Sequence, residues 1–309
     1  MADTPLATWK RVLLYAAFSL VALVAAIFIT FPYDTLQDRL KAEADSAGYN
    51  LKLGSLGPGF FSVRATKVQL AKKAANPDAP APEPLVLDSL SVGPSLFPPG
   101  LKATGSAFGG SVFARVSGIS TTSVKVELDD LDLSKGNLKA FSGIDFAGTV
   151  DVALALSIPR AAVGNGPAEP DLGQASGTFS LSTRALAVNG GTANIAIPMY
   201  GPEPTPLDLP KIVLGDIDGK LKFDKGAGTV EEFKGKSADV ELAATGTLKL
   251  AKRMEYAEPN LEVRFKPDPE FQKRLGLIGS ALSMVGPDPK DPAWRMGRLT
   301  GFLGRPAFR

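Results

Sequence analysis

The chain has 309 residues, 44% of them hydrophobic, which suits one large folded body or two small ones and excludes a disordered chain. Its 34 basic and 32 acidic residues give a net charge of +2 without a long basic run, so no nucleic-acid-binding footprint is present. Cysteine and histidine are both missing. This excludes disulfides, thiol nucleophiles, cysteine-type zinc sites and Ser-His-Asp or Cys-His catalysis, and it leaves the redox compartment open.

The first predicted element is a transmembrane helix over residues 12–31, which carry no charge. At about 1.5 Å per residue this run is roughly 30 Å long, the thickness of a bilayer core. A cleaved signal peptide is the alternative, because Lys10 and Arg11 form a basic n-region and Val24-Ala25-Ala26 resembles a cleavage site. The apolar run continues past that site, which favours an uncleaved anchor.

The orientation of this anchor follows from the charges on its two sides. Lys10 and Arg11 abut the span, whereas Arg39 and Lys41 lie several residues beyond it and beside acids. The positive-inside rule therefore predicts a cytoplasmic tail over residues 1–11 and a body on the opposite side of the membrane.

The junction at 32–48 predicts a short helix over residues 35–47. Pro32 ends the preceding helix, Asp34 is a candidate N-cap with Gln37 in the capping-box position, and Gly48 marks the C-terminal end. One stripe of this helix is apolar and comprises Leu36, Leu40, Ala44 and Ala47. The pattern fits a helix lying in the membrane interface equally well as a helix packed against the following domain.

Residues 49–309 predict a mainly β body. The segment GTVDVALALSIP alternates apolar and small or polar residues with a period of two, which is typical of a strand with one apolar face. With 32 glycines and 25 prolines between such segments, we expect one elongated antiparallel, meander-like sheet with one or two short helices. The residues predicted to form its core or an apolar groove are Val150, Val152, Leu154, Leu156, Ile158, Leu221, Phe223, Leu248, Leu250, Leu261, Val263 and Phe265.

Three proline-rich stretches, 72–84, 159–173 and 198–210, predict surface loops or extended links within this body. A late helix is predicted to begin with Asp268 as its cap and Pro269 as its first residue and to end at Gly286. Its apolar stripe either packs across the sheet or docks a partner or a membrane surface. That stripe comprises Phe271, Leu275, Ile278, Leu282 and Val285.

Two motifs that resemble functional sites are rejected on their spacing. The segment 228–237 ends in Gly-Lys-Ser, but Val230 stands where a phosphate-binding loop needs glycine. Two acidic groups, Asp129, Asp130 and Asp132, and Asp216, Asp218 and Asp224, are interpreted as turn residues and solvated strand ends, and the second group lacks calcium-loop spacing. We therefore predict no catalytic, metal-binding or cofactor-binding residue, and a protein that is not an enzyme.

The short tail, the apolar span, the junction FPYDTLQDRL and the late segment LPKIVLGDIDGKLKFDKGAGTVEEFKGKSADVELAATGTLKL together resemble the type II secretion system protein N family, delta-proteobacterial type. This resemblance implies a non-catalytic component that is anchored in the bacterial inner membrane as a single-pass protein, with a periplasmic body that contacts other secretion components. It also implies a likeness to AsmA-type proteins, whose β-structures form apolar grooves implicated in lipid handling.

Two functional hypotheses follow from a sheet with one apolar face, because such a face must be covered. If the cover is internal, the protein is an assembly subunit of type II secretion. If the face is open, the protein binds or transfers phospholipid in the cell envelope. Strand alternation predicts the same apolar positions in both cases, and the oligomeric state stays open.

Overall fold

A computed structural model describes residues 15, 18, 19, 22, 30, 32–46, 48–59, 61–73, 84–139, 143–161, 168–195, 205–252, 254–276, 279 and 285–308. Within these residues no helix has the length and apolarity needed to cross a membrane. The predicted span at 12–31 lies almost wholly outside the described residues, as do Lys10 and Arg11.

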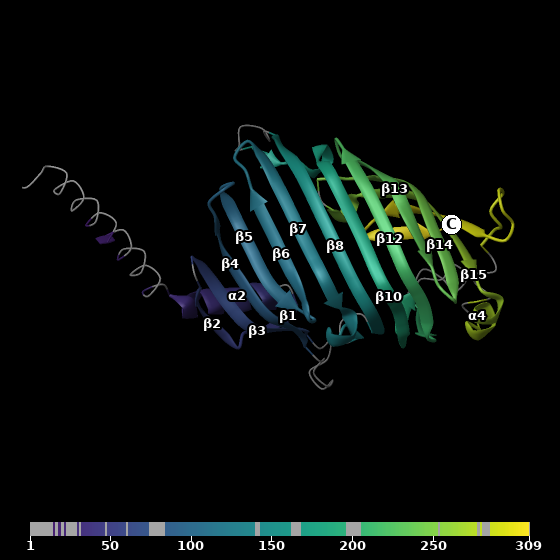
Figure 1. The fold of residues 1–309 in the computed structure, drawn as a ribbon, viewed down its shortest axis with the longest axis horizontal. Helices are drawn as coiled ribbons and strands as arrows, with labels where there is room; N and C mark the ends of the chain where they lie inside the picture. Colours follow the sequence, from purple (N-terminus) through teal and green to yellow (C-terminus); the bar gives the residue numbers. More distant parts are fainter. Residues whose placement is uncertain are drawn as a thin grey trace, which may run out of the picture.

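The protein is mainly β, as predicted (Figure 1). In the described part of the chain, seventeen strands join into one sheet. They are β1 (Tyr49–Lys52), β2 (Ser55–Gly59), β3 (Ser62–Lys72), β4 (Leu85–Ser95), β5 (Gly100–Ala107), β6 (Gly110–Ser117), β7 (Thr121–Asp132), β8 (Ile144–Ala161), β9 (Glu169–Pro170), β10 (Ser176–Ile195), β11 (Thr205–Leu209), β12 (Ile212–Asp224), β13 (Ala227–Lys236), β14 (Val240–Lys249), β15 (Glu258–Pro267), β16 (Arg295–Phe302) and β17 (Arg305–Phe308).

The strand pairing is an antiparallel meander from β2 to β17. Each of β3 to β8 pairs with the strand before and after it, and β8 then pairs with β10. From β10 the order continues through β12, β13, β14, β15 and β16 to β17. The short strands β1, β9 and β11 extend the ends of β3, β8 and β10 respectively. Antiparallel pairing thus brings sequence neighbours side by side across almost the whole sheet.

Helix α2 (Tyr33–Ser46) lies beside β1 at the N-terminal edge of the sheet (Figure 1). It matches the predicted helix over 35–47 to within two residues at each end. No residue of α2 is fully buried, and Leu40 is exposed. An ion pair between the Asp45 carboxylate and the Lys73 ammonium, 2.6 Å apart, links its C-terminal end to the end of β3. The helix is therefore attached at the N-terminal edge of the sheet, where it contacts β1 and β2.

A line of backbone irregularities bends the sheet where β7, β8, β10 and β12 meet. Asp130 in β7 and Ala185 in β10 sit in bulges with φ of 55° and 50°. The backbone N–H of Asp130 donates to the Asp151 carboxylate at 2.6 Å, and that of Ala185 donates to the Asp216 carboxylate at 2.8 Å. Bulges add an extra residue and increase local twist, so aligned bulges curve the strands about one line.

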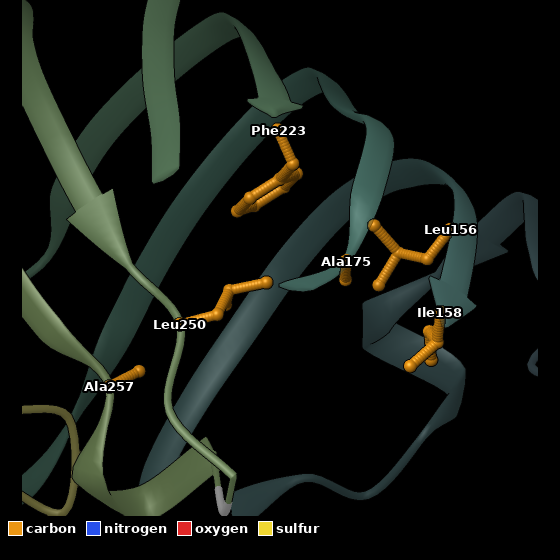
Figure 2. Close-up of a cluster of buried hydrophobic side chains, with 6 residues drawn as sticks. All are labelled: Leu156, Ile158, Ala175, Phe223, Leu250 and Ala257. Carbon is orange, nitrogen blue, oxygen red and sulfur yellow. The ribbon is translucent and has the colours of Figure 1, made fainter. Parts of the chain in front are cut away.

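A buried apolar cluster lies inside this curve, at the end of the sheet where β8, β12 and β14 terminate. Figure 2 shows its side chains, with Leu250 directed toward Ala175. Backbone hydrogen bonds connect the adjoining turns, from Gly226 N–H to the Ala175 carbonyl at 2.8 Å and from Leu250 N–H to the Gly226 carbonyl at 2.7 Å. The cluster comprises Leu156, Ile158, Ala175, Phe223, Leu250 and Ala257.

Two predictions about irregular regions need correction. Strand residues extend into the proline-rich stretches: β8 continues to Ala161, and Thr205–Leu209 forms β11. The late helix begins as predicted, with the Asp268 carboxylate accepting from the N–H groups of Glu270 and Phe271, but α4 spans only Pro269–Arg274. Gly276 adopts a φ of 55°, in the left-handed region that ends helices, so one continuous helix to Gly286 is wrong.

Candidate functional site

One face of the sheet carries three parallel rows of apolar residues, each following the register across ten strands. The middle row runs from β2 to β13 and comprises Pro58, Val63, Val92, Ala103, Ala114, Val126, Leu154, Phe179, Leu221 and Val230. A second row covers the same strands and comprises Leu56, Ala65, Leu90, Gly105, Val112, Leu128, Val152, Leu181, Gly219 and Phe233. A third runs from β4 to β15 and comprises Pro94, Leu101, Val116, Val124, Leu156, Gly177, Phe223, Gly228, Leu248 and Pro259. These three rows are called the apolar face.

The apolar face is a continuous band without a charged or hydroxyl-bearing side chain in its rows. Neighbouring strands are about 4.8 Å apart, so nine steps between ten strands make each row roughly 40 Å long. Residues two apart along a strand are separated by about 6.6 Å, so three rows form a band with a width of more than roughly 13 Å.

The opposite face of the same strands is mainly polar. Crossing from β3 to β7, the residues between the apolar rows are Arg64, Ser91, Thr104, Phe113 and Glu127. Farther along, the Glu232 carboxylate lies 2.5 Å from the Lys234 ammonium, whose hydrogen bond holds the pKa of Glu232 below its ordinary value. The two faces of the sheet therefore differ sharply, as alternation along each strand requires.

Burial along the apolar face changes from one end to the other. In the third row, Leu101 of β5 is 62% exposed and Val116 of β6 is 47% exposed, whereas Leu156 of β8 and Phe223 of β12 are each 6% exposed. The middle row contains no fully buried residue. Among the described residues, no large side chain is less than 2% exposed, so no closed core of the usual kind covers the face.

The predicted face residues all lie on this side of the sheet. In β8, Leu156 and Ile158 are buried and Val152 and Leu154 are half-buried, while Ala153, Ala155 and Ser157 are exposed on the other side. Phe223, Leu250 and Phe265 are buried. The remaining predicted members are half-buried and comprise Val150, Leu221, Leu248, Leu261 and Val263.

The contribution of β3 to β6 to the apolar face was missed by the sequence analysis. Strand β5 reads GLKATGSA, in which alanine and glycine replace large apolar residues on the face and weaken the alternation. The neighbouring segment GSVFARVS does alternate, with Val112, Ala114 and Val116 on the face, and this signal could have identified it.

The residues of the predicted docking helix have different surroundings. Phe271 is 4% exposed and Leu275 is 5% exposed, while Val285 is half-buried. Ile278 and Leu282 lie outside the described residues.

The acidic residues that resemble metal ligands serve the bends and turns. The Arg184 guanidinium lies 2.5 Å from the Asp130 carboxylate and 3.1 Å from the Asp151 carboxylate, and hydrogen bonds to these two acids raise the pKa of Arg184. Asp132 caps a 3-10 turn at Leu133–Lys135, and hydrogen bonds from Ser134 and Lys135 lower its pKa. Within the described residues, no group of three or more acidic side chains is arranged to hold a metal ion.

Comparison of the chain with protein-family models, curated protein sequences and solved structures gives no significant match.

Proposed function

We propose that the apolar face binds the acyl chains of lipids. The observation that carries this proposal is the set of three uncharged rows, ten strands long, whose side chains remain half-exposed over much of their length. An exposed apolar area of this extent is unusual on a folded protein unless something covers it. A long, flexible and uniformly apolar ligand matches its shape better than a compact polar metabolite does.

The dimensions of the face support acyl chains as the ligand. One leaflet of a bilayer has an acyl region of about 15 Å, half of a hydrocarbon core of roughly 30 Å. A row of roughly 40 Å therefore accommodates more than one acyl chain in succession. Burial of apolar surface contributes about 25 cal/mol per Å², and the headgroup can remain in water at the rim of the sheet.

This function agrees with the likeness to AsmA-type proteins that the sequence implies. The same proposal places an anchor at residues 12–31 in the inner membrane of a bacterium and the body in the periplasm. With this topology the face stands beside a membrane that supplies lipid.

Photocrosslinking in cells tests the proposal. A photoreactive residue at Val152 or Val92 faces the apolar side, and one at Ala153 faces the polar side of the same sheet. We expect phospholipid adducts from Val152 and Val92 and none from Ala153. Equal capture from both faces, or capture from neither, would overturn the proposal.

A role as an assembly subunit of type II secretion is a second candidate, favoured by the C-terminal edge of the sheet. In the described part of the chain, β17 pairs with β16 alone, so its outer edge is available to another strand. A photoreactive residue at Ala307 should then form adducts with secretion proteins. Adducts absent at Ala307 while lipid is captured at Val152 would leave lipid binding as the function.

A further inference from the structure

The sheet has one end at which large apolar side chains project from consecutive turns. The turn between β2 and β3 carries Phe61, that between β4 and β5 carries Leu96 and Phe97, and that between β6 and β7 carries Ile119. Phe97 is 91% exposed, Ile119 is 80% exposed and Leu96 is 75% exposed, and Phe61 is also exposed. The strand register places these turns side by side at the same end, which is called the turn end.

The opposite end of these strands is different. There, Phe108 in the turn between β5 and β6 is half-buried and lies close to Gly136, just after the 3-10 turn at Leu133–Lys135. An aromatic residue in a hairpin turn is thus packed at one end and left in solvent at the other. The asymmetry indicates that the turn end has a specific use, because scattered apolar residues would be found at both ends.

Basic side chains lie a short distance from the exposed turns, on the polar face. Lys102, Arg115 and Lys125 are direct cross-strand neighbours on β5, β6 and β7. All three surround the ring of Phe113, at 5.6, 5.5 and 5.6 Å from its centre. Within this trio, the Lys125 ammonium forms an ion pair with the Glu127 carboxylate at 2.6 Å.

Further cations lie on the flanking strands. Arg64 lies on β3, and Arg160 lies at the end of β8, where its guanidinium donates to the Ile119 carbonyl at 3.3 Å. The turn segments themselves, SLFPPG at 95–100 and SGIST at 117–121, contain no charged residue. At about 3.3 Å per residue, the row of Lys102 and Arg115 is set back roughly 10 Å from the tips of the turns.

We propose that the turn end docks on the surface of an anionic lipid bilayer. The side chains of Leu96, Phe97 and Ile119 enter the boundary between headgroups and acyl chains, which amphipathic elements reach to a depth of about 5–10 Å. The cations set back from the tips then lie at the level of the lipid phosphates. Apolar tips with a basic row behind them match the apolar interior and the negative phosphates of an anionic bilayer. A neutral apolar protein surface would not need the basic row.

Docking at this end places the apolar face in contact with the bilayer. Leu101 and Val116 of the third row are both exposed and lie next to the turns that carry Phe97 and Ile119. An acyl chain leaving the bilayer would meet a continuous apolar surface from the tips onto the face. This path for an acyl chain rests on the proposed function. Insertion of the turn side chains into the bilayer does not, and it is measured separately.

The absence of cysteine allows a single label to test insertion in the full chain. The label is an environment-sensitive fluorophore on Ile119→Cys, and the matched control is Lys211→Cys, an exposed position between β11 and β12 at the opposite end of the sheet. The protein is reconstituted with phosphatidylcholine vesicles with or without phosphatidylglycerol and with a quencher attached to the lipid acyl chains. Any anchoring by the N-terminal segment is the same in both variants, so the position of the label decides the result.

We expect the label at position 119 to shift to shorter wavelength and to be quenched from the bilayer, with the effect stronger in phosphatidylglycerol, while the label at 211 does not change. Each cation near an anionic surface is worth about 1 kcal/mol, so the Lys102→Gln and Arg115→Gln double variant lowers the insertion constant roughly 30-fold. Leu96→Ser with Phe97→Ser should also reduce insertion, without loss of the fold, because both side chains are exposed.

Three results would overturn the inference. The first is a label at 119 that stays in water in both lipids, and the second is equal insertion with and without phosphatidylglycerol. The third is a fluorescence shift that depends on protein concentration in the absence of lipid, which would make a second copy of the chain the occupant. Lipid captured at Val152 without insertion at Ile119 would reject docking while the proposed function survives. Insertion at Ile119 without lipid capture at Val152 would support docking and reject the proposed function.

Discussion

Strands β4–β6 and strands β8–β14 present the same kind of apolar row but bury it very differently. Leu101 and Phe223 belong to one register row, yet Leu101 is 62% exposed and Phe223 is 6% exposed. In the second region the turns at Ala175, Gly226 and Leu250 are hydrogen-bonded to one another, and their side chains cover the end of the row. An apolar strand face is thus buried in one half of this sheet and exposed in the other.

The largest expected effect is on the free energy of unfolding, when a side chain is truncated in the buried half of the apolar face and compared with one truncated in the exposed half. Phe223→Ala removes a ring from the buried cluster and should lower the free energy of unfolding by about 3–5 kcal/mol. Leu101→Ala, on the exposed half, should change it by less than about 0.5 kcal/mol. Urea denaturation of both variants measures the difference, and similar losses would mean that something covers β5 as it covers β12.

A smaller effect is expected from the bend that separates the two regions. Gly215 in β12 has a φ of 71°, and a Cβ there would lie 2.6 Å from the Lys236 carbonyl oxygen. Gly215→Ala should lower the free energy of unfolding by about 1–2 kcal/mol, the usual cost of a left-handed residue with a side chain. Gly57→Ala is the control, because no atom lies within 4 Å of its Cβ position. A neutral Gly215→Ala would show that the bend does not depend on this residue.

A substitution in the exposed half of the apolar face should change lipid binding without changing the stability of the protein. Val92→Glu places a carboxylate on the apolar face, where a bound acyl chain would leave it desolvated. We expect the variant to purify with much less bound phospholipid, measured by mass spectrometry, and to unfold at nearly the wild-type urea concentration. Ser91→Glu, on the polar side of the same strand, should retain its lipid. Equal lipid content in both variants would contradict binding on the apolar face.

The smallest expected effect is a pH dependence that belongs to the C-terminal strands. The backbone N–H of Lys290 and the nearby Arg264 guanidinium hold the pKa of Asp288 below its ordinary value of 3.8, against the opposing effect of burial. Because the folded-state pKa is the lower one, this stabilisation is complete above pH 3.8 and is lost as the pH falls through the folded-state pKa. Asp288→Asn should therefore show a shallower loss of stability in acid than the wild-type protein, in denaturation measured over a pH series. Parallel acid profiles would mean that Asp288 makes no contribution.

The amino-acid sequence by itself determined the mainly β class, the antiparallel meander and the side of β8 on which Leu154 and Leu156 lie. It did so because a period of two and short glycine-bounded turns are local properties of the chain. The sequence also predicted the start of α4, since the Asp268-Pro269 cap acts within one turn. The extent of that helix was wrong, because the preference of Gly276 for the left-handed region ended it before its apolar stripe was complete.

Only the tertiary structure decided which part of the apolar face is buried. Burial depends on turns that are distant in sequence and meet only in the folded sheet, such as those at Ala175, Gly226 and Leu250. The gathering of Phe97, Ile119 and the basic row at one end likewise follows from the register of separate hairpins. Alternation specifies which side chains share a face, whereas curvature and register specify whether that face meets protein, water or lipid.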